Sequence, residues 1–446
     1  MRRRYDAVEG GAGRGPSPGA GFFSGGFYPA GSGKGRIEPP AAERFRRKIL
    51  KSGILALMFV GLGMTAGIPA FGAAPLRGAL PLPVAPDGSI TYDWTRYSER
   101  GSRELLGLPV DPARRERELS RLADRLRPEV AGDPGGAGVP EAFRRILFRE
   151  ERFAYDSAAG NPENYLIDAV LVRKRGNCLG LSLLWLSLAE RLGLPFRGVY
   201  VPGHCFVRFE GDDTRVNVEF SDGGAPWEDG RYRKEFRVSP DRPYLHSLSP
   251  AEMTAVFLKS LGAAYARKGR DEEALGIYAE GERLSPALPD APFNAGVSLQ
   301  RLGRSGEAIA KYRKALAIDP DMAPARDNLG ILLAKGGRYE EAIAEGRKAV
   351  ELEPWNAATR GNLASAYCAC GRYEEGIREF RRAVSLDPRN ARIRAALVRA
   401  HYARGEYREA ATECDAAMAL GCRFEPSMLE VLDRYREPVA TGIALP

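Results

Sequence analysis

The sequence predicts two folded regions, an α+β domain and, after it, an all-α solenoid of helical repeats. Two observations predict this order. Helix-like and strand-like segments alternate between about residues 140 and 235, and from about residue 255 the same residue types return every 34 residues. A chain of 446 residues has room for about three domains. With 44% hydrophobic and 28% charged residues, it is not wholly disordered or fibrous.

The N-terminal residues differ from the rest of the chain in composition and charge. Residues 1–52 are basic and rich in glycine and proline, so we expect a disordered tail. They hold +7 of the formal net charge of +8. The rest of the chain is therefore nearly neutral and lacks the field that would attract nucleic acid.

Residues 53–75 combine a short apolar run with small residues after a basic cluster, the pattern of an export signal or an N-terminal membrane anchor. We expect the protein to be exported or anchored facing outside the cytoplasm, in the periplasm or cell envelope. An uncleaved signal would leave residues 53–75 as a membrane tether. A cytoplasmic protein whose apolar run is not a signal is the alternative.

Residues 76–250 are predicted to form the α+β domain, with its core at about 140–235. Short helices are expected at 112–128 and 141–152. A nearly all-apolar helix follows from Leu179 to Leu192, and Gly193 ends it. Cys178 then lies at the N-terminus of a buried helix, where the helix dipole and free N–H groups lower the pKa of a thiol. A small buried apolar residue is the alternative interpretation of this cysteine.

Two strands are predicted next, over 199–209 and 215–220. A two-residue loop between them places His204 directly opposite Glu219 on one face. A four-residue loop instead pairs Phe206 with Glu219 and leaves His204 a diagonal neighbour. A neighbouring carboxylate holds an imidazole in one tautomer and makes it more basic; a surface histidine beside an exposed glutamate is the alternative.

Residues 251–424 are predicted to form five repeats of 34 residues. The step is shared by Pro286, Pro320, Pro354 and Pro388, and by Gly269, Gly303, Gly337, Gly371 and Gly405. This period, with small residues where helices cross and a proline ending each unit, is the tetratricopeptide signature. Each unit buries its apolar face only on its neighbours, so the end of the array needs a cap. Residues 425–446 are expected to supply a capping helix and a tail.

Three asparagines recur at the same step, Asn294, Asn328 and Asn362. They fall on the first helix of each unit, where side chains often face the inner groove of the array. We expect them to bind a protein or peptide partner, or alternatively to make hydrogen bonds between helices.

The order of the candidate residues is that of a thiol nucleophile, its base and an orienting group. The motifs Gly176-Asn177-Cys178, Pro202-Gly203-His204 and Asn217-Val218-Glu219 resemble those of bacterial transglutaminase-like proteins. The resemblance covers about residues 100–240 and implies a papain-like fold. The expected fold is thus an α+β papain-like, transglutaminase-like domain followed by an all-α tetratricopeptide solenoid.

The resemblance implies a role for each residue. Cys178 would be the nucleophile, His204 the general base and acid, and Glu219 the third member. The family usually has aspartate in the third position, and Asn217 is the alternative third member. No glutamine shortly before Cys178 can supply a papain-type oxyanion hole, so Asn177 or Asn164 is expected to assist the backbone N–H of Cys178.

The remaining cysteines and histidines fit packing better than chemistry. Cys205 is expected in the core, on the strand face opposite His204. Packing is also expected for Cys368, Cys370, Cys414, Cys422 and His401. The sequence lacks a glycine-rich phosphate loop and zinc-ligand spacing, so we expect no cofactor and no metal.

Two functions follow as hypotheses. The first is a cysteine-dependent amidase, peptidase or transamidase that acts on a protein or peptide by acyl transfer, with the repeats mediating protein interaction. The alternative is a non-catalytic scaffold that uses both regions for binding.

Overall fold

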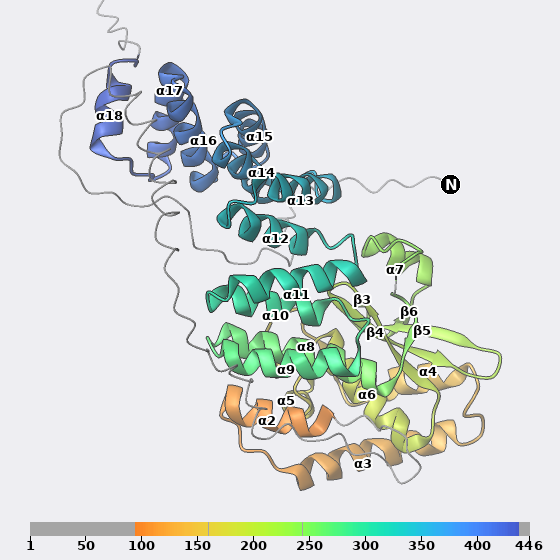
Figure 1. The fold of residues 1–446 in the computed structure, drawn as a ribbon. Coiled ribbons are helices and arrows are strands. Elements are labelled where there is room, and N and C mark those ends of the chain that lie inside the picture. The colour runs from red at the N-terminus through yellow and green to blue at the C-terminus, as the bar shows by residue number, and fades with distance from the viewer. Residues whose placement is uncertain (1–93, 159, 243, 437–446) are drawn as a thin grey trace, which may run out of the picture. The chain divides into compact units, whose positions relative to one another are not determined.

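The computed structural model describes residues 94–158, 160–242 and 244–436. The predicted tail (1–52), the predicted signal or anchor (53–75) and residues 437–446 lie outside the described residues. Within the part that is described, no helix is both long and apolar enough to cross a membrane. The expected fold class is confirmed, because a domain of helices and a sheet precedes a long run of paired helices (Figure 1).

The domain is built around one buried helix, α6 (Cys178–Leu192). Its own residues from Leu179 to Ala189 are all buried, so it has no exposed polar face. The Asn177 side chain caps its start by accepting a hydrogen bond from the Gly180 N–H at 3.0 Å. Gly193 ends it in the left-handed conformation at φ +67°.

Other helices cover α6 on one side. They are α2 (Trp94–Leu106), α3 (Pro112–Val130), α4 (Gly138–Arg144), a π-helical turn (Arg145–Glu150) and α5 (Ile167–Arg173). The expected helices at 112–128 and 141–152 are thus present with shifted ends. A small parallel pair, β1 (Ala154–Tyr155) and β2 (Arg175–Gly176), leads directly into Cys178.

An antiparallel sheet in the order β6-β5-β4-β3-β7 covers the other side of α6. Its strands are β3 (Phe196–Val201), β4 (His204–Glu210), β5 (Arg215–Glu219), β6 (Ala225–Pro226) and β7 (Ser247–Leu248). A 3-10 turn (Phe220–Asp222) follows β5, and α7 (Asp229–Glu235) follows β6.

The single strand expected over 199–209 is wrong. Val201 pairs with His204, so β3 and β4 are a hairpin joined by Pro202 and Gly203. Proline sets the second position of such a turn, and the third needs a positive φ, which Gly203 adopts at +78°. Proline followed by glycine is a turn signal that the alternating apolar pattern concealed. The turn makes His204 the first residue of a strand.

The register of β4 and β5 is the second of the two predicted. Val207 lies opposite Val218 and Arg208 opposite Asn217, with the four residues 211–214 as the loop. His204 is therefore a diagonal neighbour of Glu219.

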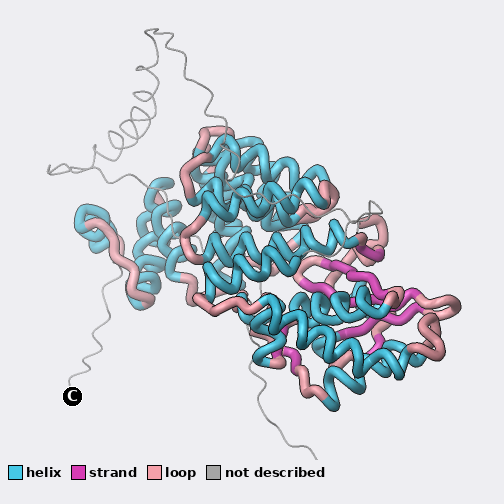
Figure 2. Tube along the Cα trace, turned by 90° about the horizontal axis from the view of Figure 1, so that it is seen from below, coloured by secondary structure: helices cyan, strands magenta, loops and turns pink. Residues whose placement is uncertain are grey.

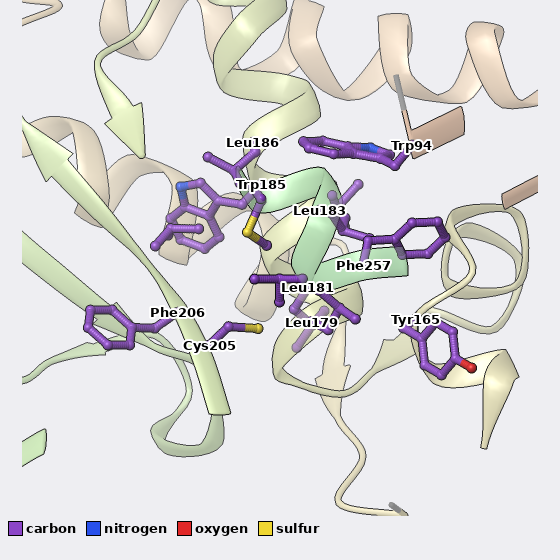
Figure 3. Close-up of a cluster of buried hydrophobic side chains, with 14 of the residues drawn as sticks. Trp94, Tyr165, Leu179, Leu181, Leu183, Trp185, Leu186, Cys205, Phe206 and Phe257 are labelled. Carbon is purple, nitrogen blue, oxygen red and sulfur yellow. The ribbon is translucent and has the colours of Figure 1, made fainter. Parts of the chain in front are cut away.

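Figure 3 shows the core between α6 and its neighbours. Trp185 stacks on Phe143 at a centroid distance of 5.0 Å and meets Phe220 edge-on at 5.5 Å. Phe257, from the first helix of the repeats, is fully buried in the same cluster. The core of the domain is thus continuous with the start of the solenoid.

The repeats are five helix pairs within the described residues, laid side by side (Figures 1 and 2). The pairs are α8 (Pro250–Arg267) with α9 (Asp271–Leu284), α10 (Asp290–Arg301) with α11 (Ser305–Ile318), α12 (Ala323–Lys335) with α13 (Tyr339–Leu352), α14 (Ala357–Ala369) with α15 (Tyr373–Leu386), and α16 (Ala391–Arg404) with α17 (Tyr407–Ala419). A Cβ at Gly296 would lie 2.7 Å from the ring of Tyr312, which explains the small residue at this crossing. The last helix, α18 (Pro426–Asp433), buries Leu432 against α17.

Gly180 offers a test of the packing of α6. A Cβ there would lie 2.1 Å from the carbonyl oxygen of Asn164, which is rigid backbone. We expect Gly180→Ala to lower the free energy of unfolding by about 3 kcal/mol, because the helix or the chain beside it must move. Urea denaturation followed by tryptophan fluorescence measures this loss. The control is Gly230→Ala in α7, where the Cβ meets open space; equal stability of the two variants would contradict the prediction.

Candidate active site

Cys178 is the first residue of α6 and is partly exposed. Its sulfur is hydrogen-bonded to the thiol and the backbone N–H of Cys205 and to the His204 ring. The hydrogen bond with the Cys205 thiol, and after it the bond and positive charge of His204, hold the pKa of Cys178 well below the usual value of a thiol. Burial opposes this shift. The shift favours the thiolate, which is the nucleophilic form.

His204 connects this sulfur to a carboxylate. Its Nε2 lies 2.8 Å from Oε2 of Glu219, and the same ring is hydrogen-bonded to Cys178. Phe236 stacks on the ring at 4.8 Å and 11° and fixes its plane. Burial lowers the pKa of His204, but hydrogen bonds to Cys178 and Glu219 and the charges of both outweigh it and raise the pKa to about 10. Thiolate and imidazolium thus form an ion pair.

Glu219 is fully buried and has a partner for each oxygen. Oε2 also accepts a hydrogen bond from the Tyr232 hydroxyl at 3.0 Å, and Oε1 accepts from Ser221 through its N–H at 2.9 Å and its hydroxyl at 2.6 Å. Burial raises the pKa of Glu219, but the bonds to His204 and Ser221 lower it below its ordinary value. A charged carboxylate therefore faces the imidazolium.

Asn217, the alternative third member, is engaged elsewhere. Its Oδ1 accepts a hydrogen bond from Arg208 Nε at 2.7 Å, and its Nδ2 donates to the Trp227 carbonyl and to Asp229, both at 2.8 Å. It holds the fully buried guanidinium of Arg208 rather than the imidazole. The structure brings Glu219, and not Asn217, to His204.

The two candidates for the third position are separated by one pair of variants. Asn217→Ala is expected to cost about 1–3 kcal/mol of stability, since it leaves the buried Nε of Arg208 without its acceptor. The pH dependence of Cys178 alkylation is expected to stay unchanged. Glu219→Gln removes the charge that faces His204 and is expected to raise the apparent pKa of Cys178. Iodoacetamide alkylation followed across pH measures both. If Asn217→Ala raised the apparent pKa of Cys178 and Glu219→Gln did not, Asn217 would be the third member.

Of the two residues expected near the oxyanion, Asn164 does not point to the site. It is fully buried, and its Nδ2 donates to the Ala158 carbonyl at 3.2 Å. Its own carbonyl accepts the Asn177 N–H at 2.8 Å and so positions the turn before Cys178. Asn177 is partly exposed beside Cys178 and caps α6 through Oδ1. The expectation of a donor at Asn164 is therefore wrong, because the core already uses its amide.

The three repeat asparagines differ in their contacts. Asn362 donates to both carboxylate oxygens of Asp327, at 3.1 and 2.9 Å, and bridges α14 and α12. Asn328 is buried and hydrogen-bonds Tyr312. Asn294 is partly exposed on α10. Hydrogen bonds between helices thus account for Asn328 and Asn362.

The cysteines and histidine expected to pack are free thiols or buried side chains. Cys368 and Cys414 are buried, and Cys370 and Cys422 are partly exposed without a disulfide. His401 is buried and bonds Glu406 through Nδ1 at 2.6 Å.

Sequence reasoning missed four side chains around the triad: Ser221, Tyr232, Phe236 and the thiol of Cys205. Ser221 lies two residues after Glu219, the spacing of a local turn. This spacing is too common in sequences to predict a contact with the site. Tyr232 and Phe236 lie on and just after α7, and only the packing of that helix over the sheet brings them to His204.

The first repeats reach the hairpin that carries His204. The Tyr200 hydroxyl of β3 donates to Asp290 of α10 at 2.8 Å and accepts from Lys259 of α8 at 3.0 Å. The same hydroxyl lies 3.4 Å from the N–H of Gly203, the residue before His204. The solenoid therefore supports the turn that positions the imidazole.

Comparisons with known proteins agree with this architecture. Residues 113–255 match the family model described as transglutaminase-like superfamily, and residues 293–357 and 371–420 match two models described as tetratricopeptide repeat. A UPF0162 protein of Xylella fastidiosa strain 9a5c is 31% identical over 167 residues, and one of strain Temecula1 is 28% identical. Each alignment covers 35% of this chain and 59% of the relative, so the chain spans about three fifths of these curated relatives.

Among solved structures, MamA (41-end) from Desulfovibrio magneticus RS-1 is 26% identical with a TM-score of 0.36 and covers 37% of this chain and 94% of its own. Pseudomonas aeruginosa PilF is 23% identical with a TM-score of 0.38, over 41% and 85%. At these TM-scores the likenesses carry no further argument. The chain therefore contains a domain of the transglutaminase-like superfamily followed by tetratricopeptide repeats, an architecture that supports a role in protein interaction.

Proposed function

We propose that the protein is a cysteine-dependent acyl-transfer enzyme that acts on an amide or ester of a protein or peptide. One observation carries the proposal. A single imidazole is hydrogen-bonded on one side to the sulfur of Cys178 and on the other to the buried carboxylate of Glu219. This geometry is what a thiol nucleophile needs, because the imidazole can hold its proton and return it.

The reaction runs in two balanced steps. Cys178 Sγ bonds the carbonyl carbon, the bond from that carbon to the leaving nitrogen or oxygen breaks, and the His204 proton moves to the leaving group. A thioester remains on Cys178. Water or an amine then attacks the thioester, gives its proton to His204 and releases the thiolate. Water makes the reaction a hydrolysis and an amine makes it a transamidation.

The oxyanion that forms at the carbonyl needs donors. Cys178 begins α6, and the first N–H groups of a helix have no partner within the helix. Its backbone N–H is the first donor in this proposal, and the side-chain amide of Asn177 is the second.

An activity-based acyl probe tests the proposal. A thiol-directed acylating reagent is expected to label the full chain at Cys178 and to leave Cys178→Ala unlabelled. Cys370→Ala is the matched control, because it removes another partly exposed thiol that lies in the repeats. Labelling that survives in Cys178→Ala would refute the role of Cys178.

The pH dependence provides a second check. A raised pKa keeps His204 protonated below about 10. If protonation of the leaving amine by His204 limits acylation, the rate with an amide substrate is expected to fall as pH rises through about 10. Acylation by an activated ester, whose leaving group needs no proton, should keep its rate over that interval. A fall with both substrates would point to a different titrating group.

A non-catalytic scaffold is the second candidate, favoured by the repeat array itself, since tetratricopeptide repeats support protein interaction. In that case Cys178 would alkylate as an ordinary thiol with a pKa near 8.5, unaffected by His204→Ala.

Location belongs to the same proposal. The segment 53–75 is taken as an export signal or membrane tether that places the catalytic domain outside the cytoplasm. Cell fractionation combined with protease protection tests this. If the protease cannot digest the chain after the outer membrane is permeabilised while the inner membrane stays intact, the protein would be assigned to the cytoplasm instead.

A further inference from the structure

Two thiols meet at the start of α6. Cys205 follows His204 on β4, and its thiol is hydrogen-bonded to Cys178. Ser182, one helical turn after Cys178, donates to Cys205 Sγ at 3.9 Å. Figure 3 shows the Cys205 side chain pointing from its strand toward the first turn of α6, away from Phe206. The Cys205 sulfur therefore lies over the helix face that carries Cys178 and Ser182.

The two thiols differ in access and in charge. Cys178 is partly exposed and has a lowered pKa, whereas Cys205 is 2% exposed. The hydrogen bond to Cys178, and then burial, raise the pKa of Cys205 well above that of an ordinary thiol. An oxidant from solvent therefore reaches Cys178, whose thiolate form is favoured, before it reaches the buried Cys205, whose protonated form is favoured.

We propose that Cys178 and Cys205 are a redox pair that closes a reversible disulfide when a hydroperoxide oxidises the site. This regulates the site of the proposed function and relies on it only in taking Cys178 as a reactive thiolate. The disulfide removes the nucleophile and leaves Glu219 and His204 in place.

The chemistry balances with a hydroperoxide as the oxidant. The Cys178 thiolate attacks the peroxide oxygen, the O–O bond breaks, and Cys178 becomes a sulfenic acid. The alkoxide or hydroxide that leaves takes the His204 proton and departs as an alcohol or water. Cys205 then attacks the sulfenic sulfur, the S–O bond breaks, and its thiol proton leaves with the hydroxide as water. His204 lies beside Cys178 and can relay that proton.

The resolving thiol determines whether oxidation is reversible. A sulfenic acid without a nearby thiol proceeds to sulfinic acid, which ordinary thiols do not reduce. A disulfide between Cys178 and Cys205 stops the oxidation one step earlier and can be reduced by an external thiol. Cys205 thereby protects a catalytic sulfur from permanent loss.

Peptide mapping of the oxidised full chain tests the pair. The reduced protein is treated with limiting hydrogen peroxide, free thiols are blocked with N-ethylmaleimide, and trypsin is added. Cleavage after arginine releases residues 176–191 and 198–208, each with one cysteine. The expected result is one linked species of these two peptides, two hydrogens lighter than their sum, which dithiothreitol separates. Unlinked peptides with Cys178 carrying extra oxygen, or with Cys178 unoxidised, would overturn the proposal.

A variant gives the matched comparison. In Cys205→Ser, the sulfenic acid that forms at Cys178 should persist long enough for dimedone to trap it, and without dimedone Cys178 should go on to sulfinic acid, with two added oxygens. After oxidation, dithiothreitol should restore acyl-probe labelling of the wild type and not of the variant. If the variant folds poorly, the peptide map of the wild-type protein is sufficient to test the disulfide. Cys368 and Cys370 serve as internal controls for nonspecific oxidation. Linked peptides without acyl-probe labelling would refute the proposed enzyme activity and support the redox pair. Acyl-probe labelling without linked peptides would support the activity and refute the redox pair.

Discussion

Replacing His204 by alanine is expected to slow the alkylation of Cys178 by iodoacetamide at pH 6.5 by roughly 30-fold. In the wild type the charge and hydrogen bond of His204 favour the deprotonated sulfur. Without the imidazole the pKa of Cys178 rises toward ~8.5, where about 1% of the thiol is ionised at pH 6.5; the hydrogen bond from Cys205, which also lowers this pKa, remains in the variant. The higher intrinsic nucleophilicity of a more basic thiolate recovers part of this roughly 100-fold loss.

The measurement is the second-order rate of alkylation of the Cys178 peptide between pH 5 and 9. The sign follows from the direction of the shift. A lowered pKa means that the wild-type rate reaches its plateau at a lower pH than the variant rate, which keeps rising toward about pH 8.5. His401→Ala is the control, since it removes another buried imidazole that pairs with a glutamate in the repeats. Superimposable wild-type and His204→Ala profiles would favour the scaffold.

Replacing Asp290 by alanine is expected to destabilise the transglutaminase-like domain by about 2–3 kcal/mol, although Asp290 belongs to the repeats. Lys259 Nζ lies 3.6 Å from Asp290 and 4.7 Å from the centre of the Tyr200 ring, with side-chain exposures of 15% and 20% for the ion pair. Removing one member of a largely buried pair leaves the other charge without compensation, which costs 3–5 kcal/mol when burial is complete. Partial exposure lowers the expected value.

Urea denaturation followed by tryptophan fluorescence reports on this loss, because Trp94 and Trp185 are buried in the domain whereas Trp355 of the repeats is 78% exposed. Lys259→Met combined with Asp290→Ala completes a double-mutant cycle, in which the double variant should lose less than the sum of the single losses. Glu307→Ala, which breaks an exposed pair with Arg304, is the control and should change stability by less than about 1 kcal/mol. An equally small change for Asp290→Ala would show that this ion pair does not couple the repeats to the stability of the domain.

The solenoid was predictable from the sequence because its contacts repeat. Gly296 stands opposite Tyr312 at one helix crossing, and glycine and a tyrosine recur in the neighbouring unit as Gly262 and Tyr278. A contact that recurs every 34 residues leaves a period in the sequence. The transglutaminase-like domain has no such period and was recognised through three short motifs.

The hairpin shows where local patterns stop being informative. The two registers considered for β4 and β5 differ by two residues, so both place Asn217 and Glu219 on the same face. Side-chain alternation therefore could not choose between them. The structure adopts the register in which the buried Arg208 lies opposite Asn217 and also reaches Asp229 beyond β6.

By itself, the sequence determined the residue types of the site, the helix start that holds Cys178 and the shared face of Asn217 and Glu219, since each depends on neighbours a few positions away. Only the tertiary structure decided that Glu219 rather than Asn217 meets the imidazole, that Asn164 is used within the core, and that Cys205 reaches Cys178. These contacts depend on how α6 packs on a twisted sheet and how α7 covers it. Such packing joins residues far apart in the chain, and no local spacing encodes the distance between them.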